Sequence, residues 1–185
     1  MSVRELFSDG LNIKKVLESR RGYIRVLTES GEEVERVGGT VAWRCNNPGN
    51  LKNGRFSKSY GSIGEDYIGH AVFPTLEQGR NAQYNLLFNE NSRYFSLTLE
   101  KAINRYAPAG DANNEPDKYI NYISRNANID SNDILGKLSE EQKNDMIKYM
   151  SIFEGYKEGR DNYIGDWYAK NKKSIRSRRS YATTS

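Results

Sequence analysis

The ten residues Trp43–Lys52 (Trp-Arg-Cys-Asn-Asn-Pro-Gly-Asn-Leu-Lys) restrict the fold of this chain more than any other stretch. Proline disfavours a helical conformation at the residue before it, Pro-Gly favours a turn, and Asn50 tolerates the left-handed backbone that often follows. The stretch therefore predicts irregular backbone that carries three Asn carboxamides and one guanidinium. These fixed donors and acceptors suit a polyhydroxyl or amide ligand such as a sugar chain. They equally suit a tight connecting loop whose Asn side chains cap their own backbone.

The elements predicted around this loop give a mostly helical α+β domain with a small N-terminal β-hairpin. A short helix is expected over 11–18, and β-branched strands over 23–28 and 34–37 flank a turn. After the loop come a glycine-rich connection over 54–64 and a short strand over 67–73. Capping residues, a helix-start proline and helical spacing predict the remaining helices, which begin near Thr75, Thr98, Pro116 and Ser139, with a last short one within 156–169.

Four separated motifs occur in an order that resembles a known family. They are the aromatic-Arg-x-Asn-Asn-Pro-Gly-Asn motif after Gly38-Gly39-Thr40, then Tyr60–Gly64, then Ala71–Thr75 with Glu77 and Gly79, and finally Arg105–Pro108. Over about residues 36–155 the chain resembles the NNPGN family of phage virion proteins and bacterial type VI secretion effectors, a group similar to lysozyme-like peptidoglycan hydrolases. The resemblance implies a lysozyme-like domain with a cleft between a helical lobe and a β edge. Cys45 departs from the pattern, because the family usually has a third Asn there.

The resemblance implies action on the glycan strands of peptidoglycan, as a muramidase or a lytic transglycosylase, with no cofactor. The alternative is a non-enzymatic secreted effector that keeps the scaffold and binds a host or bacterial protein. With Cys45 and His70 as its only Cys and His, the chain has no internal disulfide and no His/Cys metal cluster. Glycosidic cleavage needs a carboxylic acid that is protonated near neutral pH, and a lytic transglycosylase manages with one.

Three sets of carboxylates are candidates for this acid. Glu77 matches the Glu-x-Gly position of the family, although it also suits a helix start that the macrodipole stabilises. Glu65 and Asp66 lie beside the aromatic Tyr67, although such a pair also suits a solvated turn. Glu35 lies about where flagellar-type glucosaminidases, a more distant resemblance, carry their catalytic Glu, although an outward-facing strand residue is the simpler account.

The candidates for substrate binding are aromatic rings that stack on pyranose faces and polar groups that bind acetamido groups. The rings are Trp43, Tyr60 and Tyr106, and the polar side chains are Arg44, Asn46, Asn47 and Asn50. Aromatic residues are more often part of a core, and Tyr106 also lies on the apolar face of a predicted helix. Its place in the Arg-Tyr-Ala-Pro motif keeps it among the candidates.

The charge is unevenly distributed along the chain. The net charge is +4, but residues 170–185 hold six of the 28 Lys and Arg and none of the 24 Asp and Glu, so the rest sums to -2. A nucleic-acid-binding domain would be basic on its own surface, whereas the chain before residue 170 is mildly acidic. The basic end suits contact with anionic polymers, or a purely solubilising role. These features divide the chain into an N-terminal helical extension (1–20), a lysozyme-like domain (21–169) and a basic flexible tail (170–185).

The first residues contain no apolar run of the kind found in export signals, and no segment reaches the length of a membrane span. The expectation is therefore a chain made in the cytoplasm and exported by a signal-independent secretion machine, carried by a phage particle, or released by lysis. The expected partners are the peptidoglycan strand, the delivery apparatus, and an immunity protein or a host protein.

Overall fold

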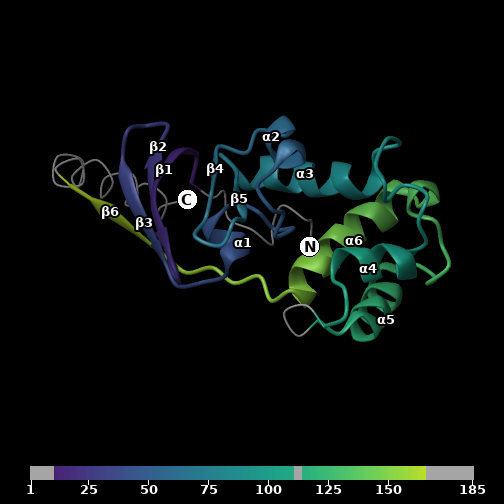
Figure 1. Cartoon of the computed structure of the whole chain (residues 1–185). Coiled ribbons are helices and arrows are strands. Elements are labelled where there is room, and N and C mark those ends of the chain that lie inside the picture. The colour runs from purple at the N-terminus through teal and green to yellow at the C-terminus, as the bar shows by residue number, and fades with distance from the viewer. Residues whose placement is uncertain (1–10, 111–113, 166–185) are drawn as a thin grey trace, which may run out of the picture.

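The computed structural model describes residues 11–110 and 114–165, and it is an α+β fold. An antiparallel sheet lies at one end and the longer helices lie at the other (Figure 1). The sheet has four strands in the order β1-β2-β3-β6, namely β1 (Ile13–Arg20), β2 (Tyr23–Thr28), β3 (Glu33–Val37) and β6 (Arg160–Ile164). The α+β class is confirmed. The predicted hairpin is only the centre of this sheet, so the description of the β part as a small hairpin is wrong.

The helix expected over 11–18 is wrong, because these residues form most of strand β1. The chain turns back after Arg20, and Arg20 pairs directly with Tyr23 across a two-residue turn. Gly22 in this turn has a φ of 72°, which is the left-handed backbone that glycine adopts at little cost. Ile13 at the start of the strand is fully buried, so pairing with β2 decides the structure over the weak helical spacing.

The helix expected within 156–169 is also wrong over its described part, where strand β6 pairs with β3 from Val37↔Arg160 to Glu33↔Ile164. Asp161 on this strand accepts a hydrogen bond from Arg36 Nε at 3.2 Å. Arg36 is 1% exposed, and a buried guanidinium needs a partner of opposite charge. Long-range pairing therefore holds this segment extended.

The helices follow the start signals read from the sequence. The hydroxyls of Thr75, Thr98 and Ser139 cap three of them, and Pro116 is the first residue of a fourth. These helices are α3 (Leu76–Phe88), α4 (Leu99–Tyr106), α6 (Glu140–Phe153) and α5 (Pro116–Ala127). Shorter elements are α1 (Val41–Arg44), α2 (Arg55–Ser59), β4 (Gly64–Glu65), β5 (Ala71–Val72) and the 3-10 helix η2 (Leu135–Lys137). The expected strand over 67–73 is thus shorter than predicted, and α2 lies within the connection predicted over 54–64.

The core consists of apolar clusters under each part of the fold. The largest lies among α3, α4, α5 and α6 and includes Ile103, Ile123 and Met146. Another lies under the sheet, around Ile24, Val26 and Val34, and includes Cys45.

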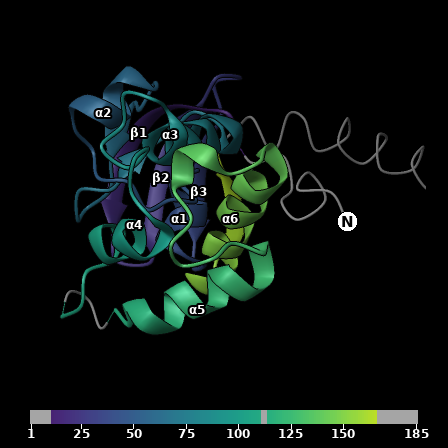
Figure 2. The ribbon, with the colours of Figure 1, turned by 90° about the vertical axis from the view of Figure 1, so that its right-hand side faces the viewer.

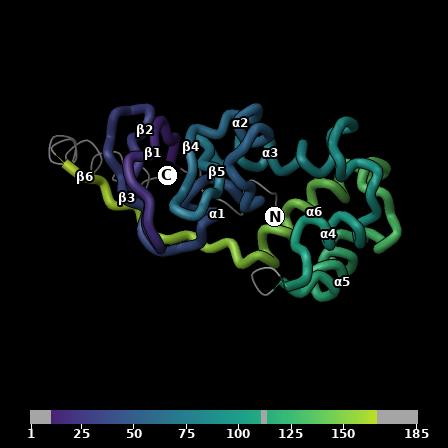
Figure 3. The backbone as a smooth tube through the Cα atoms, viewed as in Figure 1, coloured from purple at the N-terminus to yellow at the C-terminus, as the bar shows by residue number. Residues whose placement is uncertain are grey.

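After α6 the chain runs back to the sheet, as the tube in Figure 3 shows. Seen from the helical end, α6 lies to the right of the labelled strands and α5 lies below them (Figure 2). The Asn-rich loop lies between these two parts of the chain.

The basic tail predicted for 170–185 lies outside the described residues. Within the described ranges, no helix has the length and apolar content needed to cross a membrane.

Candidate functional site

Asn46, the first asparagine of the motif, is a structural residue at the centre of the loop. Its side chain is 1% exposed, and its Oδ1 accepts a hydrogen bond from Arg36 Nη1 at 2.9 Å. Its Nδ2 donates to the carbonyls of Leu11 and Pro74, both at 2.9 Å, and to that of Phe73 at 3.2 Å. The backbone of Asn46 is left-handed, with a φ of 50°. The carboxamide therefore ties strand β3 and the chain before β1 to the chain after β5, and its polar atoms are already occupied.

Asn47 and Cys45, on either side of Asn46, are also part of the interior. Asn47 is fully buried, donates to the carbonyls of Leu51 and Ala71, and accepts a hydrogen bond from the Leu51 amide at 3.0 Å. Cys45 is 1% exposed, and burial raises the pKa of its thiol to about 12. The position where the chain departs from the family pattern thus packs into the apolar cluster under the sheet.

Trp43 and Arg44 contact residues that precede the loop. The Trp43 ring is 5% exposed and packs against the Arg36 guanidinium, whose central carbon lies 4.1 Å from the ring centroid. Arg44 Nη1 donates to the carbonyls of Gly38 and Gly39, both at 2.7 Å. Because buried polar groups need such partners, the two carbonyls account for the burial of the Arg44 guanidinium without a ligand.

Gly79, the glycine of the Glu-x-Gly motif, is required by close packing between α3 and the loop. A Cβ atom at this position would lie 1.9 Å from the carbonyl oxygen of Asn46. Helix α3 thus approaches the loop more closely than any other residue type allows.

Asn50, the last asparagine of the motif, differs from the others because it reaches a large cleft. The cleft has a volume of about 1060 Å³, and residues of the loop and of the helical part both line it. Asn50 Nδ2 donates across this boundary to Glu154 Oε2 at 2.7 Å. The loop therefore presents one carboxamide to the cleft and uses the other two for its own structure.

Glu154 is the carboxylate that the sequence analysis missed. It is the residue after α6, it lines the cleft, and its Oε1 accepts a hydrogen bond from the Tyr119 hydroxyl at 2.8 Å. Burial raises the pKa of Glu154, while the hydrogen bonds from Tyr119 and Asn50 lower it, and the effect of burial is the larger. Its position at the carboxyl end of a helix also disfavours the ionised form. The sequence signal that could have identified this residue is a Glu between the aromatic Phe153 and Gly155, where the predicted helix ends.

Aromatic side chains line the cleft beside Glu154. Tyr119 and Phe153 stack on each other with ring centroids 4.1 Å apart, and Phe153 is 37% exposed. Tyr106, one of the predicted rings, also lines the cleft, and its hydroxyl donates to the Gly49 carbonyl. Tyr60 does not line the cleft and instead packs against Phe56 with ring centroids 4.8 Å apart.

The four predicted acids do not line the cleft. Glu77 is exposed on the first turn of α3, and Glu65 is exposed on β4, where it accepts a hydrogen bond from Asn53 at 3.1 Å. Glu35 lies on β3 and accepts a hydrogen bond from the Tyr23 hydroxyl at 2.8 Å. The structure thus separates these candidates from Asn50.

Asp66 holds a turn together. Its Oδ1 accepts hydrogen bonds from the amides of Ile68 and His70 at 3.0 and 2.8 Å, and its Oδ2 lies 3.4 Å from His70 Nδ1. His70 lines the cleft, and burial lowers the pKa of its ring despite the neighbouring carboxylate.

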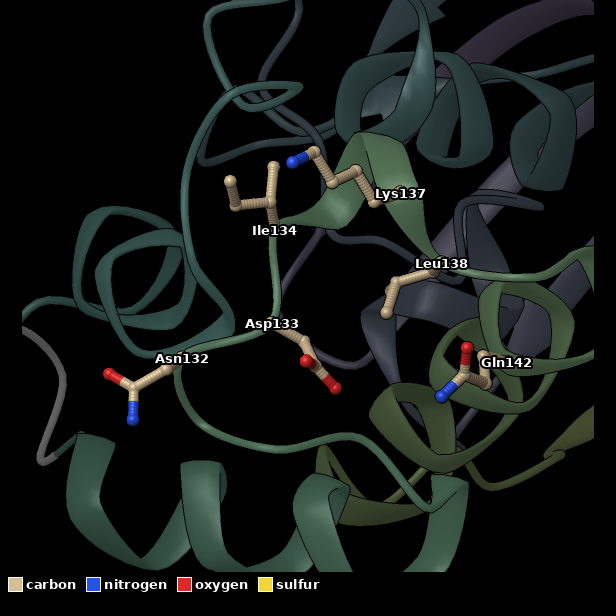
Figure 4. Close-up of a pocket in the computed structure, with 6 residues that line it drawn as sticks. All are labelled: Asn132, Asp133, Ile134, Lys137, Leu138 and Gln142. Atoms are coloured by element: carbon tan, nitrogen blue, oxygen red, sulfur yellow. The ribbon is translucent and has the colours of Figure 1, made fainter.

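A second hollow, of about 310 Å³, lies beside η2 and the start of α6. Figure 4 shows that its side chains do not converge, because Asn132 and Gln142 lie at opposite sides and Lys137 points away from Asp133. We therefore place the candidate site in the larger cleft.

Among the residues that the structure describes, no three His, Cys, Asp or Glu side chains are grouped so that they could hold a metal ion. The cleft brings together a half-buried carboxyl group, its two hydrogen-bond donors, several aromatic rings and the imidazole of His70. No protein-family model and no curated protein matches this chain.

Proposed function

We propose that this protein cleaves the glycan strands of bacterial peptidoglycan in the large cleft, with Glu154 as the catalytic acid and base. The observation that supports this most directly is the position of Glu154, a carboxyl group with a raised pKa that faces an open cleft and is held by the Asn-rich motif. The family resemblance of the motif supports the choice of peptidoglycan. The lysozyme-like character of the fold is part of the same proposal.

The environment of Glu154 suits general acid catalysis. The acid must be protonated when it meets the glycosidic oxygen, and burial beside aromatic rings favours the protonated form. The two hydrogen bonds, from Asn50 and Tyr119, stabilise the carboxylate that remains after the proton has left. Burial therefore favours the protonated form of Glu154 before the step. The two donors orient the carboxyl group and stabilise the negative charge that forms on it.

The number of carboxylates in the cleft favours a lytic transglycosylase over a hydrolase. Glu115 is the other acidic residue among the described residues that line the cleft, and its side chain is 59% exposed and pairs with Lys118 at 2.6 Å. With one suitable carboxyl group, Glu154 gives its proton to the leaving oxygen as the glycosidic bond breaks. A hydroxyl of the same sugar then attacks the anomeric carbon, and its proton passes to the Glu154 carboxylate. The product is an anhydro sugar, and no water is consumed.

The resemblance to phage virion proteins and type VI effectors supports delivery to the cell wall by a phage particle or a signal-independent secretion machine. A bacterium that makes such a protein would need protection where it meets its own wall, for which an immunity protein is the expected partner. These statements rest on the resemblance alone.

The test is release of soluble fragments from purified peptidoglycan, read by mass spectrometry, for the wild type and Glu154→Gln. Glutamine suits this position because its oxygen can accept from Asn50 while its amide donates to the Tyr119 hydroxyl. We expect release to fall by roughly 10²- to 10⁴-fold, the usual contribution of a general acid. Glu77→Gln and Glu65→Gln, at exposed acids away from the cleft, are the matched controls and should keep full activity.

Anhydro-muramyl products would identify a transglycosylase, and reducing ends would identify a hydrolase. If the folded wild type releases nothing over a range of pH and wall sources, the enzymatic proposal fails. The alternative of a secreted effector that only binds a protein partner would then stand.

A further inference from the structure

The cleft that contains Glu154 is also lined by cations that the catalytic proposal does not use. Arg93 follows α3, Arg105 lies on the last turn of α4, and Lys52 belongs to the Asn-rich loop, and all three are exposed. Arg105 Nη1 donates to the Arg93 carbonyl at 2.9 Å. The central carbons of the two guanidinium groups lie 5.5 and 5.9 Å from the centroid of the Tyr94 ring, so both groups lie beside this ring.

These cations have no acidic partner within the described parts of the chain. The ion pairs found there involve other residues, and Lys52 Nζ instead lies 3.2 Å from the Ile68 carbonyl and 3.3 Å from His70 Nε2. The acidic residues among the described lining of the cleft are Glu115, which pairs with Lys118, and Glu154, which accepts from neutral donors. The described lining of the cleft therefore has more positive than negative side chains around Glu154.

This arrangement indicates the class of ligand that the cleft is built for. A neutral amino-sugar polymer offers hydroxyl and acetamido groups, to which a guanidinium can donate hydrogen bonds but which carry no opposite charge. Carboxylates on the sugar chain can accept paired hydrogen bonds from a guanidinium, and such charge-assisted bonds are about twice as strong as neutral ones. The walls of the cleft also exclude part of the solvent that would screen the attraction.

We propose that Arg93 and Arg105, with Lys52, form a carboxylate-binding subsite, so that the cleft selects glycan strands whose sugars carry acidic substituents over neutral strands of the same length. This inference rests on the proposed function for the identity of the strand. The acidic groups have two possible sources, the carboxylates of the attached peptides and the lactyl carboxylates of sugars without a peptide.

The test is equilibrium binding to Glu154→Gln, which holds the substrate without cleaving it. The probes are a chitin tetrasaccharide, a wall-derived tetrasaccharide with its peptides, and the same tetrasaccharide with the peptides removed by an amidase. We expect Arg93→Gln/Arg105→Gln to weaken binding of the charged probes by about five- to tenfold, from one modest ion pair for each guanidinium. Binding of the chitin probe should not change. Lys52→Gln should cause a smaller loss in the same direction.

The matched control is Lys101→Gln/Arg125→Gln, which removes the same charge from exposed positions that do not line the cleft. Thermal unfolding of each variant checks that it is folded. A loss confined to the probe with peptides would assign the subsite to peptide carboxylates. A loss confined to the peptide-free probe would assign it to the lactyl carboxylates that the amidase exposes, and a loss for both would show that the subsite accepts either. Raised salt should weaken the charged probes and spare the neutral one.

The inference is overturned if the parent binds neutral and charged probes equally, or if the control weakens binding as much as the cleft variants. These results are separable from the proposed function. A wild type that cleaves peptidoglycan but shows no charge preference contradicts the subsite alone. A wild type that binds the charged probe through Arg93 and Arg105 but cleaves nothing contradicts the catalytic role of Glu154 alone.

Discussion

Replacing Asn46 by alanine is the sharpest test of the structural role assigned to the Asn-rich motif. The change removes an acceptor from Arg36 Nη1, a buried charged donor, at 2.9 Å. It also removes the Nδ2 donor from the carbonyls of Leu11 and Pro74, both at 2.9 Å. Finally, it places alanine at a φ of 50°, in the left-handed region that alanine rarely adopts.

The expected loss of stability follows from these contacts. A hydrogen bond to a charged group contributes about 2 kcal/mol, and two neutral bonds contribute about 1 kcal/mol each. The left-handed backbone adds about 1 kcal/mol. The free energy of unfolding should therefore fall by about 5 kcal/mol, which is a large part of the 5–15 kcal/mol usual for a folded domain. For a chain of this size, that corresponds to a drop of roughly 10–20 °C in Tm.

The measurement is urea unfolding followed by circular dichroism, with two further variants as controls. Asn46→Gly loses the same hydrogen bonds but tolerates the backbone, so it should be about 1 kcal/mol more stable than Asn46→Ala. Asn50→Ala has the same backbone problem, with a φ of 47°, but loses only the contact with Glu154. It should therefore lose about 2 kcal/mol. If Asn46→Ala and Asn50→Ala lose equal stability, the assignment of Asn46 to the interior is refuted.

Three further predictions follow from the same contacts. Gly79→Ala should lose about 3 kcal/mol in chemical denaturation, because the new Cβ would lie 1.9 Å from the Asn46 carbonyl oxygen and α3 must shift. Cys45 should react with a thiol reagent at pH 8 only as urea unfolds the protein, since the buried thiol has a pKa of about 12. The raised pKa of Glu154 means that the folded protein holds this proton after the unfolded chain has lost it. As the pH rises above the ordinary value of 4.5, denaturation at a series of pH values should therefore show the wild type losing stability relative to Glu154→Gln.

The helices were largely predictable because their start signals are local. Thr98 and Ser139 accept hydrogen bonds from backbone amides three residues ahead, a contact that depends on neighbouring residues alone. Strands β1 and β6 were mispredicted as helices because partners far along the chain decide them. The register between β3 and β6 joins residues more than 120 positions apart, as in Arg36↔Asp161. The residues next to each of them in the sequence give no sign of this pairing.

The candidate site was predictable in part, for a related reason. Asn50, Tyr106 and Arg44 do line the cleft, and the motif identified them. The carboxyl group was missed because its environment is tertiary. In the sequence, Glu154 is one of 24 Asp and Glu residues and follows a predicted helix that carries several charges. Only its contact with Asn50, 104 residues away, distinguishes it.

The motif has three asparagines because the loop has two separate requirements. A buried loop needs side chains that both donate and accept without carrying charge, and the carboxamide does both. Asn46 forms hydrogen bonds with strand β3 and with the chain before β1, and Asn47 forms them with β5. Together they set the position of the turn that follows. Asn50 lies on that turn and reaches Glu154 on the other part of the fold. A substitution at Asn46 should therefore change the cleft as well as the stability, because Asn50 lies on the turn whose position Asn46 and Asn47 set.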